Sequence, residues 1–181
     1  MEFVSIPLSS AHRLLHPQLA VLITVRGRDG KANVMTAAWC MPVSHRPPLV
    51  CVSIAPKRFT HRLIVESGEF AINIPSLEML KIVDLCGTCS GAQVNKFKKF
   101  NLPTVEAKVI NAPIISSCIA FIECKVVNSV KAGDHTLFIG KIVAAYTRGN
   151  IFDKIYMLDK CKLPLHLGGD MYTTCHGVYR P

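Results

Sequence analysis

The sequence predicts a mainly β protein, an antiparallel barrel whose helices lie in the connections between strands. Apolar runs of strand length recur along the 181 residues, half of which are hydrophobic. The helix-like stretches are short and stand between these runs. The glycine-rich patterns G-x-G-x-x-G and G-x-x-x-x-G-K-[ST], which open phosphate-binding loops in α/β proteins, are missing. These observations favour a barrel over a doubly wound parallel sheet, as a single domain spanning residues 1–181.

Turn-forming residues divide the first third of the chain. Ser9 and Ser10 are expected to cap a short helix that ends before Pro17. The Asp29-Gly30 pair predicts a tight hairpin turn, because these residue types adopt positive φ readily. Prolines at 42, 47 and 48 are expected to break the chain. The strands expected between these signals cover residues 19–26, 34–39 and 49–54.

Two helices and three strands are expected in the remainder. Thr60 is expected to be the N-cap of a helix that ends at Gly68, and Ser76 the N-cap of a second helix that ends near Gly87. Beyond Pro164 one more short apolar run is expected. The expected strands are 69–74, with alternating exposure, and a long antiparallel pair over 119–130 and 135–146.

The formal net charge of +9 indicates attraction for anionic partners. The densest basic cluster, residues 96–100, is short and has no nucleic-acid-binding motif around it, so we expect no nucleic-acid partner. Small molecules that contain phosphate suit the charge equally well. Every apolar run is far shorter than the roughly 20 residues of a membrane-spanning helix, and no signal peptide is evident, so we expect no membrane partner and a cytoplasmic location.

Eight cysteines are scattered through the chain, several of them in apolar runs, and we expect reduced thiols. Cys86 and Cys89 form a C-x-x-C motif. We favour two cysteines at a helix end, one of them packed inward, and the alternative is a dithiol redox pair. Since no second pair stands at the spacing of a zinc site, we expect no metal.

A site for phosphate is expected where Lys57 and Arg58 precede a helix. The N-terminus of a helix has unpaired N–H groups and a positive dipole end. Arg58 can bind phosphate oxygens in a bidentate manner and Thr60 can donate its hydroxyl hydrogen. The alternative is an ordinary helix start with solvated basic residues.

A series of segments, in order along nearly the whole chain, resembles the flavoredoxin and flavin reductase-like family. Each segment is weakly specific by itself, but together they are specific. The matching segments are residues 33–39, 47–50, 53–54, 58–61, 66–70, 73–76, 90–91, 96–97, 133–140 and 165–169, with Tyr172.

The resemblance implies an FMN-binding split β-barrel, antiparallel and Greek-key-like, in a homodimer with the flavin near the subunit interface. It implies that Ser53, Arg58 and Thr60 hold the FMN phosphate. Similar proteins have arginine and aspartate where this chain has Ala92 and Asn95, which alters a loop near the cofactor. The other implied cofactor-binding residues are Asn33, Met35, Thr36, Ala37, Ala38 and Trp39 on one strand, and Ser90, Gly91 and Lys96 in that loop.

Two residues are candidates for a catalytic role. In similar proteins the histidine at the position of His135 faces the flavin or the nicotinamide, where an imidazole stabilises negative charge or guides a hydride donor. The alternative is a strand-end histidine bonded to Asp134. Cys40, just after the flavin-lining strand, is a weaker candidate for redox contact.

The leading functional hypothesis is an NAD(P)H-dependent flavin reductase that passes hydride from NADH or NADPH to FMN. A flavoredoxin-type electron carrier, which takes electrons from a redox protein partner and has no nicotinamide site, is the first alternative. A non-catalytic FMN-binding or basic nucleic-acid-binding module is the second. The sequence leaves open which nicotinamide donates and whether free flavin, ferric iron, a disulfide or a protein accepts the electrons.

Overall fold

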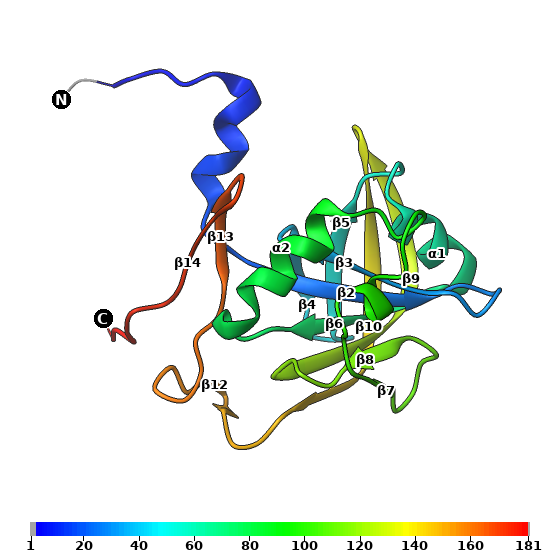
Figure 1. Ribbon diagram of the computed structural model, residues 1–181. Coiled ribbons are helices and arrows are strands. Elements are labelled where there is room, and N and C mark those ends of the chain that lie inside the picture. Colours follow the sequence, from blue (N-terminus) through cyan, green and yellow to red (C-terminus); the bar gives the residue numbers. More distant parts are fainter. Residues whose placement is uncertain (1–2, 181) are drawn as a thin grey trace.

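The computed structural model describes residues 3–180, and its centre is an antiparallel sheet of seven strands (Figure 1). The sheet curls, so that its first strand contacts its sixth. The predicted mainly β, antiparallel open barrel is confirmed. In their order across the sheet the strands are β3 (Ala32–Ala37), β2 (Val21–Arg26), β6 (Glu69–Ile74), β9 (Ala120–Ala132), β10 (His135–Thr147), β5 (Leu49–Ile54) and β4 (Cys40–Ser44).

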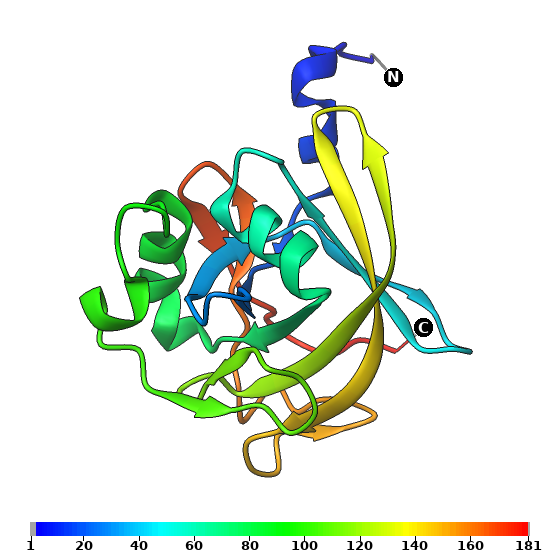
Figure 2. The same cartoon turned by 90° about the vertical axis from the view of Figure 1, so that its right-hand side faces the viewer.

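Short helices and small sheets surround the barrel. Helix α1 (Phe59–Ser67) packs against β2 and β3, and helix α2 (Leu80–Thr88) packs against the same two strands (Figures 1 and 2). No helix within residues 3–180 is both long and apolar enough to span a membrane. The remaining elements are the 3₁₀ helices η1 (Leu8–Leu15) and η2 (Leu77–Met79), the helices α1 (Phe59–Ser67), α2 (Leu80–Thr88) and α3 (Lys96–Lys99), and the strands β1 (Gln18–Leu19), β7 (Thr104–Glu106), β8 (Pro113–Ile115), β11 (Phe152–Asp153), β12 (Ile155–Tyr156), β13 (Leu165–Gly168) and β14 (Met171–Thr173).

The central strands β2 and β6 bury both faces. Ile23 and Ile72 point into the barrel, whereas Leu22 and Ala71 pack on the other side with Ile114 and its neighbours. The expected alternating exposure of residues 69–74 is therefore wrong, since every residue from 70 to 74 is buried. The reason is tertiary, because α2 and the segment around β8 cover a face that would otherwise meet solvent.

Of the hydroxyl residues expected to cap helices, Ser76 does so, whereas Ser9, Ser10 and Thr60 lie inside helices. Arg58, with an extended backbone, is the N-cap of α1, and Thr60 lies inside that helix. Ser9 and Ser10 lie within η1, which follows Pro7. Ser76 is an N-cap, as expected, but the helix after it is 3₁₀ at first and α-helical only from Leu80.

Two of the expected turns or strand breaks differ in detail from the observed structure. The β2–β3 hairpin is a loop of residues 27–31 closed by a Gly27 N–H bond to the Lys31 carbonyl, and Gly30 alone within it has positive φ, at 79°. Pro42 lies within β4 rather than ending a strand. β4 is at the edge of the sheet, where one side needs no backbone donor, so proline is tolerated there.

Candidate functional site

Two pockets adjoin along strand β3 and form one groove. The first, the polar pocket, has a volume of about 320 Å³ and the second, the aromatic pocket, about 370 Å³. They share Met35, Thr36, Lys57 and Arg58. Arg58 is exposed at the N-terminus of α1, where its guanidinium can reach ligands in either pocket.

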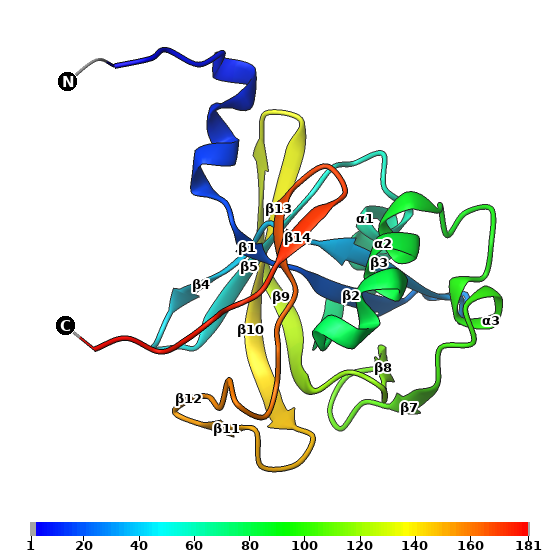
Figure 3. The same ribbon diagram turned by 60° about the vertical axis from the view of Figure 1, so that its left-hand side comes forward.

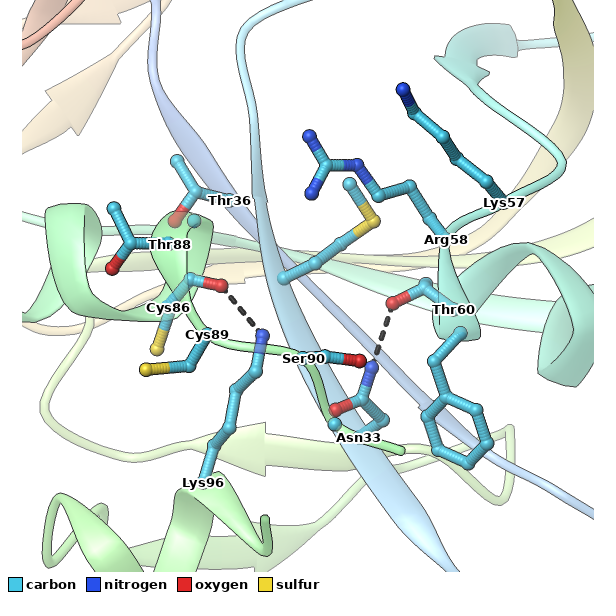
Figure 4. Close-up of a pocket in the computed structure, with 14 residues that line it drawn as sticks. Asn33, Thr36, Lys57, Arg58, Thr60, Cys86, Thr88, Cys89, Ser90 and Lys96 are labelled. Atoms are coloured by element: carbon cyan, nitrogen blue, oxygen red, sulfur yellow. Dashed lines mark hydrogen bonds between the residues drawn. The ribbon is translucent and has the colours of Figure 1, made fainter. Parts of the chain in front are cut away.

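The polar pocket is built from elements far apart in the sequence (Figure 4). Strand β3 supplies one wall, the start of α1 supplies Lys57 and Arg58, and the end of α2 with the loop after it supplies residues 86–91. Hydroxyl, amide and cationic groups dominate the lining. The unpaired N–H groups and the dipole of α1 add positive potential at the same place.

A buried hydrogen bond fixes one end of the polar pocket. The Asn33 amide donates to the Thr60 hydroxyl at 2.8 Å, and both residues are at most 3% exposed. Gly91 lies directly against this amide, since a Cβ there would be 1.9 Å from the Asn33 Oδ1 atom. Only glycine fits such an approach, so loop residue 91 and the Asn33–Thr60 pair are sterically coupled.

Lys96 is a buried cation in the wall of the same pocket. It is 3% exposed, and its ammonium donates to the carbonyls of Val34 at 2.8 Å and Cys86 at 2.6 Å. Burial lowers the pKa of this ammonium, while the nearby thiols of Cys86 and Cys89 oppose the shift. An ammonium has three hydrogens, so one donor is available to a ligand in the pocket.

The aromatic pocket lies on the other side of Arg58. The rings of Trp39 and His135 are 5.0 Å apart between centroids, with an interplanar angle of 40°. His135 Nδ1 donates to the Asp134 carboxylate at 2.7 Å, and this bond lowers the pKa of Asp134. The remaining ring nitrogen of His135 is left for a ligand, so the bond to Asp134 and a place in the pocket are compatible.

The N-terminal helix and the C-terminal hairpin complete the aromatic pocket. His12 packs edge-on against Trp39 at 5.7 Å, and His16 packs against His166 of β13 at 5.4 Å. Sequence reasoning missed these residues as site components. The only available signal was the match of the tail to the family, because the packing depends on the pairing of β1 with β13, about 150 residues apart.

The groove brings together all twelve of the expected cofactor-binding residues. The polar pocket contains Asn33, Thr60, Ser90, Gly91 and Lys96, and Met35, Thr36 and Arg58 line both pockets. Ala37, Ala38, Trp39, Ser53 and His135 line the aromatic pocket.

The geometry adds detail on individual residues. Ser53 and Thr60 line different pockets of the groove, and Arg58, the third expected phosphate ligand, lines both. Cys40 belongs to neither lining, and burial raises the pKa of its thiol to about 12. A thiol of that kind is protonated at neutral pH, which speaks against the expected redox contact.

The donor set suits an organic phosphate with a planar ring. Cations and a helix N-terminus match a phosphate, the hydroxyls and the amide match a polyol chain, and Trp39 with the backbone of residues 36–38 matches a flat ring. Within residues 3–180 no cluster of His, Cys, Asp or Glu has the arrangement of a metal site. The residues present therefore fit FMN.

Comparisons with known proteins agree with this interpretation. An uncharacterized protein of Archaeoglobus fulgidus is 48% identical over 138 residues, which are 76% of this chain and 76% of that protein. The structure of a flavoredoxin from Methanosarcina acetivorans matches with a TM-score of 0.88 and 28% identity, covering 100% of this chain and 95% of that one. An FMN-binding protein from Thermus thermophilus, solved with bound p-hydroxybenzaldehyde, matches with a TM-score of 0.85 and 27% identity over 100% of this chain and 99% of that one.

A model of one protein family covers most of the chain. It is described as the flavin reductase like domain and matches residues 12–172, which include every expected site residue. The match and the shared fold agree with the resemblance seen in the sequence, and the chain belongs to the flavin reductase-like family.

Proposed function

We propose that this chain binds FMN in the groove along β3 and works as an NAD(P)H-dependent flavin oxidoreductase. The observation that carries the proposal is the position of Arg58 between a cationic, hydroxyl-lined pocket and an aromatic one. Arg58, Lys57 and Lys96 would hold the phosphate. The segment from Thr36 to Trp39 would line the flavin.

The chemistry divides between cofactor and protein. FMN, when bound, supplies the capacity to accept a hydride and to pass electrons on. The chain positions the cofactor through the helix N-terminus at Arg58 and covers the aromatic pocket with η1 and the β13–β14 hairpin. His135, oriented by its bond to Asp134, presents its Nε2 atom to that pocket, where this nitrogen accepts a hydrogen bond in the neutral ring and donates one in the protonated ring.

A flavoredoxin-type electron carrier is the second candidate function, and one observation favours it. The Asn95 side chain caps α3 by accepting from the Lys98 N–H at 3.1 Å, so it is engaged within its own helix. Ala92 supplies no charged group. The loop thus lacks the arginine and the aspartate of similar proteins, which are groups that a nicotinamide nucleotide could use.

Anaerobic reduction separates the two functions. FMN-loaded protein is titrated with NADH, NADPH or dithionite, and flavin absorbance near 450 nm is followed. We expect one of the nicotinamides to bleach the flavin within seconds at stoichiometric amounts. Bleaching by dithionite alone would reject the reductase and support the carrier. A protein that takes up no FMN would reject both.

We also propose that the working form is a homodimer. The N-terminal segment projects from the barrel at the same end as the β9–β10 hairpin (Figures 1 and 3). Its apolar side chains are exposed, with Phe3 at 91%, Leu8 at 90% and Leu14 at 74%. An apolar surface of this kind indicates a partner surface, and it lies beside the aromatic pocket, where the second subunit would shield the flavin.

A further inference from the structure

The C-x-x-C motif lies in the polar pocket, and the proposed function does not use it. Cys86 and Cys89 both line this pocket beside Lys96. Their sulfur atoms lie on the same side of the end of α2 (Figure 4). Cys86 is buried and Cys89 is half-buried, and none of the other six free cysteines lines this pocket.

The two thiols are placed for a bond with each other after a small movement. Residues three apart on a helix have Cβ atoms about 5–6 Å apart, and a disulfide needs about 3.5–4.5 Å. Cys86 is inside α2, whereas Cys89 is its C-cap, with extended φ of −93° and ψ of 149°. The long 3.3 Å bond from the Cys89 N–H to the Leu85 carbonyl offers little resistance, so Cys89 is the residue that can move.

Movement of Cys89 is transmitted to the pocket by a compact turn. The Ser90 carbonyl accepts from the N–H groups of Gln93 and Val94 at 3.1 and 3.2 Å, and the Ser90 hydroxyl accepts from the Ala92 N–H at 3.3 Å. The turn therefore moves as a unit with Cys89. Gly91, within that turn, is in close contact with the Asn33 amide. A shift of the turn therefore disturbs the hydrogen bond between Asn33 and Thr60.

We propose that Cys86 and Cys89 are a thiol–disulfide exchange site that reacts with low-molecular-weight disulfides, and that the disulfide form binds FMN less tightly. The coupling to FMN rests on the proposed function, whereas the exchange chemistry does not.

The exchange balances with a small disulfide RSSR as the oxidant. The half-buried Cys89 sulfur, which lines the pocket, attacks one sulfur of RSSR as a thiolate. The S–S bond of RSSR breaks, RS⁻ leaves, and a mixed disulfide forms on Cys89. Cys86 then attacks the Cys89 sulfur and releases the second RS⁻. The two protein thiols lose two electrons, and their two protons end on the two RSH molecules.

The surroundings set the rate of this reaction. Burial raises the pKa of Cys86 to about 11, and the Lys96 ammonium partly offsets the shift. Because the thiolate is the nucleophile, the second step is slow at neutral pH and accelerates as pH rises. Basic groups at the pocket, namely Lys57, Arg58 and Lys96, favour anionic disulfides as reactants.

Glutathione disulfide is the probe for the test, and peptide mapping follows the product. Wild-type protein is incubated with it at pH 7 and pH 9, and is then alkylated, digested and mapped by mass spectrometry. We expect a Cys86–Cys89 disulfide that forms faster at pH 9. Cys175→Ser, which removes a half-buried cysteine elsewhere, is expected to behave like wild type, and Cys89→Ser to form no such bond. Mixed glutathione adducts alone in wild type would overturn the exchange site.

The consequence for the pocket is measured by two independent methods. FMN titration is expected to give a dissociation constant about tenfold higher for the oxidised protein, a typical coupling between sites, and dithiothreitol should reverse it. Amide hydrogen exchange is expected to be faster in residues 88–94 of the oxidised form. An unchanged FMN affinity would overturn the coupling, whether or not amide hydrogen exchange changes.

A failure of the proposed function can be distinguished from a failure of the thiol–disulfide exchange site. Reduced protein that binds no FMN would reject the proposed function. The disulfide map and the hydrogen exchange would still decide whether the thiol pair exists and moves the turn.

Discussion

Arg58 lines both pockets from the N-terminus of α1. Removal of its guanidinium therefore tests the phosphate site at the scale of a single residue. Arg58→Ala is expected to weaken FMN binding about 10–100-fold, the equivalent of a lost charge-assisted bond. Riboflavin, which has no phosphate, should bind the variant and the wild type equally, and fluorescence titration measures both ligands.

Arg62→Ala is the matched control for that substitution. Arg62 lies one turn further along α1, and its partner is Glu66 at 3.4 Å. Its removal should leave both affinities unchanged. An equal loss of FMN and riboflavin affinity in Arg58→Ala would show that the guanidinium shapes the fold rather than binding phosphate.

Gly91 is the second residue-scale test. Gly91→Ala places a Cβ against the Asn33 side chain, and the resulting overpacking is expected to cost about 1–3 kcal/mol of stability and to weaken FMN binding. Gly87→Ala is the control for stability, since its Cβ would meet Thr36 at an ordinary 3.5 Å. Thermal unfolding compares the two variants and FMN titration checks Gly91→Ala, and unchanged stability of Gly91→Ala contradicts the tight contact.

At the residue scale, the sequence predicted which residues line the groove, but it did not predict the contacts that each of them makes. The basic pair before α1 was visible because a helix start is a local feature. The bonds of Thr60 with Asn33 and of Lys96 with Val34 join residues 27 and 62 positions apart. No local sequence pattern predicts such long-range hydrogen bonds. In the sequence, a buried lysine within a basic cluster cannot be distinguished from a solvent-exposed lysine.

At the element scale, Glu123 of β9 anchors the loop of residues 107–111. Its carboxylate accepts from the backbone N–H groups of Lys108, Val109 and Ile110 at 2.8, 2.8 and 3.2 Å, and from the Tyr146 hydroxyl at 2.9 Å. Burial raises the pKa of Glu123, but these bonds outweigh burial and hold it below its usual value. The carboxylate thus stabilises the folded form in its charged state.

Glu123→Gln is expected to lower the free energy of unfolding by about 1–3 kcal/mol at pH 7, because buried donors lose a charged acceptor. In the wild type this contribution is complete above the unfolded pKa of about 4.3 and is lost as pH falls through the lower, folded pKa. Urea unfolding between pH 2 and pH 7 measures it. The exposed Glu78→Gln is the control, and equal pH dependence in wild type and Glu123→Gln contradicts this role.

Local signals predicted the regular elements but not the irregular ones. Apolar runs placed β2, β5, β6, β9 and β10 close to their observed bounds, and Gly68 ends α1 as expected. The short elements α3, β7 and β8 were missed, because they depend on tertiary contacts rather than on periodicity: β8 packs against β2 and β6, α3 packs against β3, and β7 pairs with β8.

At the scale of the whole molecule, the apolar N-terminal segment tests the homodimer. Leu14 and Leu15 are 74% and 73% exposed, so a charge there leaves the folded subunit intact. Leu14→Asp is expected to shift the protein toward monomer and to weaken FMN binding, as measured by sedimentation and titration. Val105→Asp, on the exposed strand β7, should remain dimeric. A monomeric wild type that binds FMN tightly contradicts the dimer.

The barrel was predictable as a whole because many weak signals agree. Strand-rich patterning and missing phosphate-loop motifs predicted the class, and the ordered family segments specified the type. The closing of the aromatic pocket by η1 and β13 was not predictable, since it joins the two ends of the chain.

The central claim, that the groove at Arg58 binds FMN through its phosphate, is tested most directly by comparing FMN with riboflavin. Both ligands are titrated into the reduced, cofactor-free protein, and flavin fluorescence is followed. The proposed site predicts saturable FMN binding and riboflavin binding weaker by about 10–100-fold, because riboflavin forgoes the charge-assisted phosphate bonds. Equal affinity for the two flavins, or no binding of either, would contradict it.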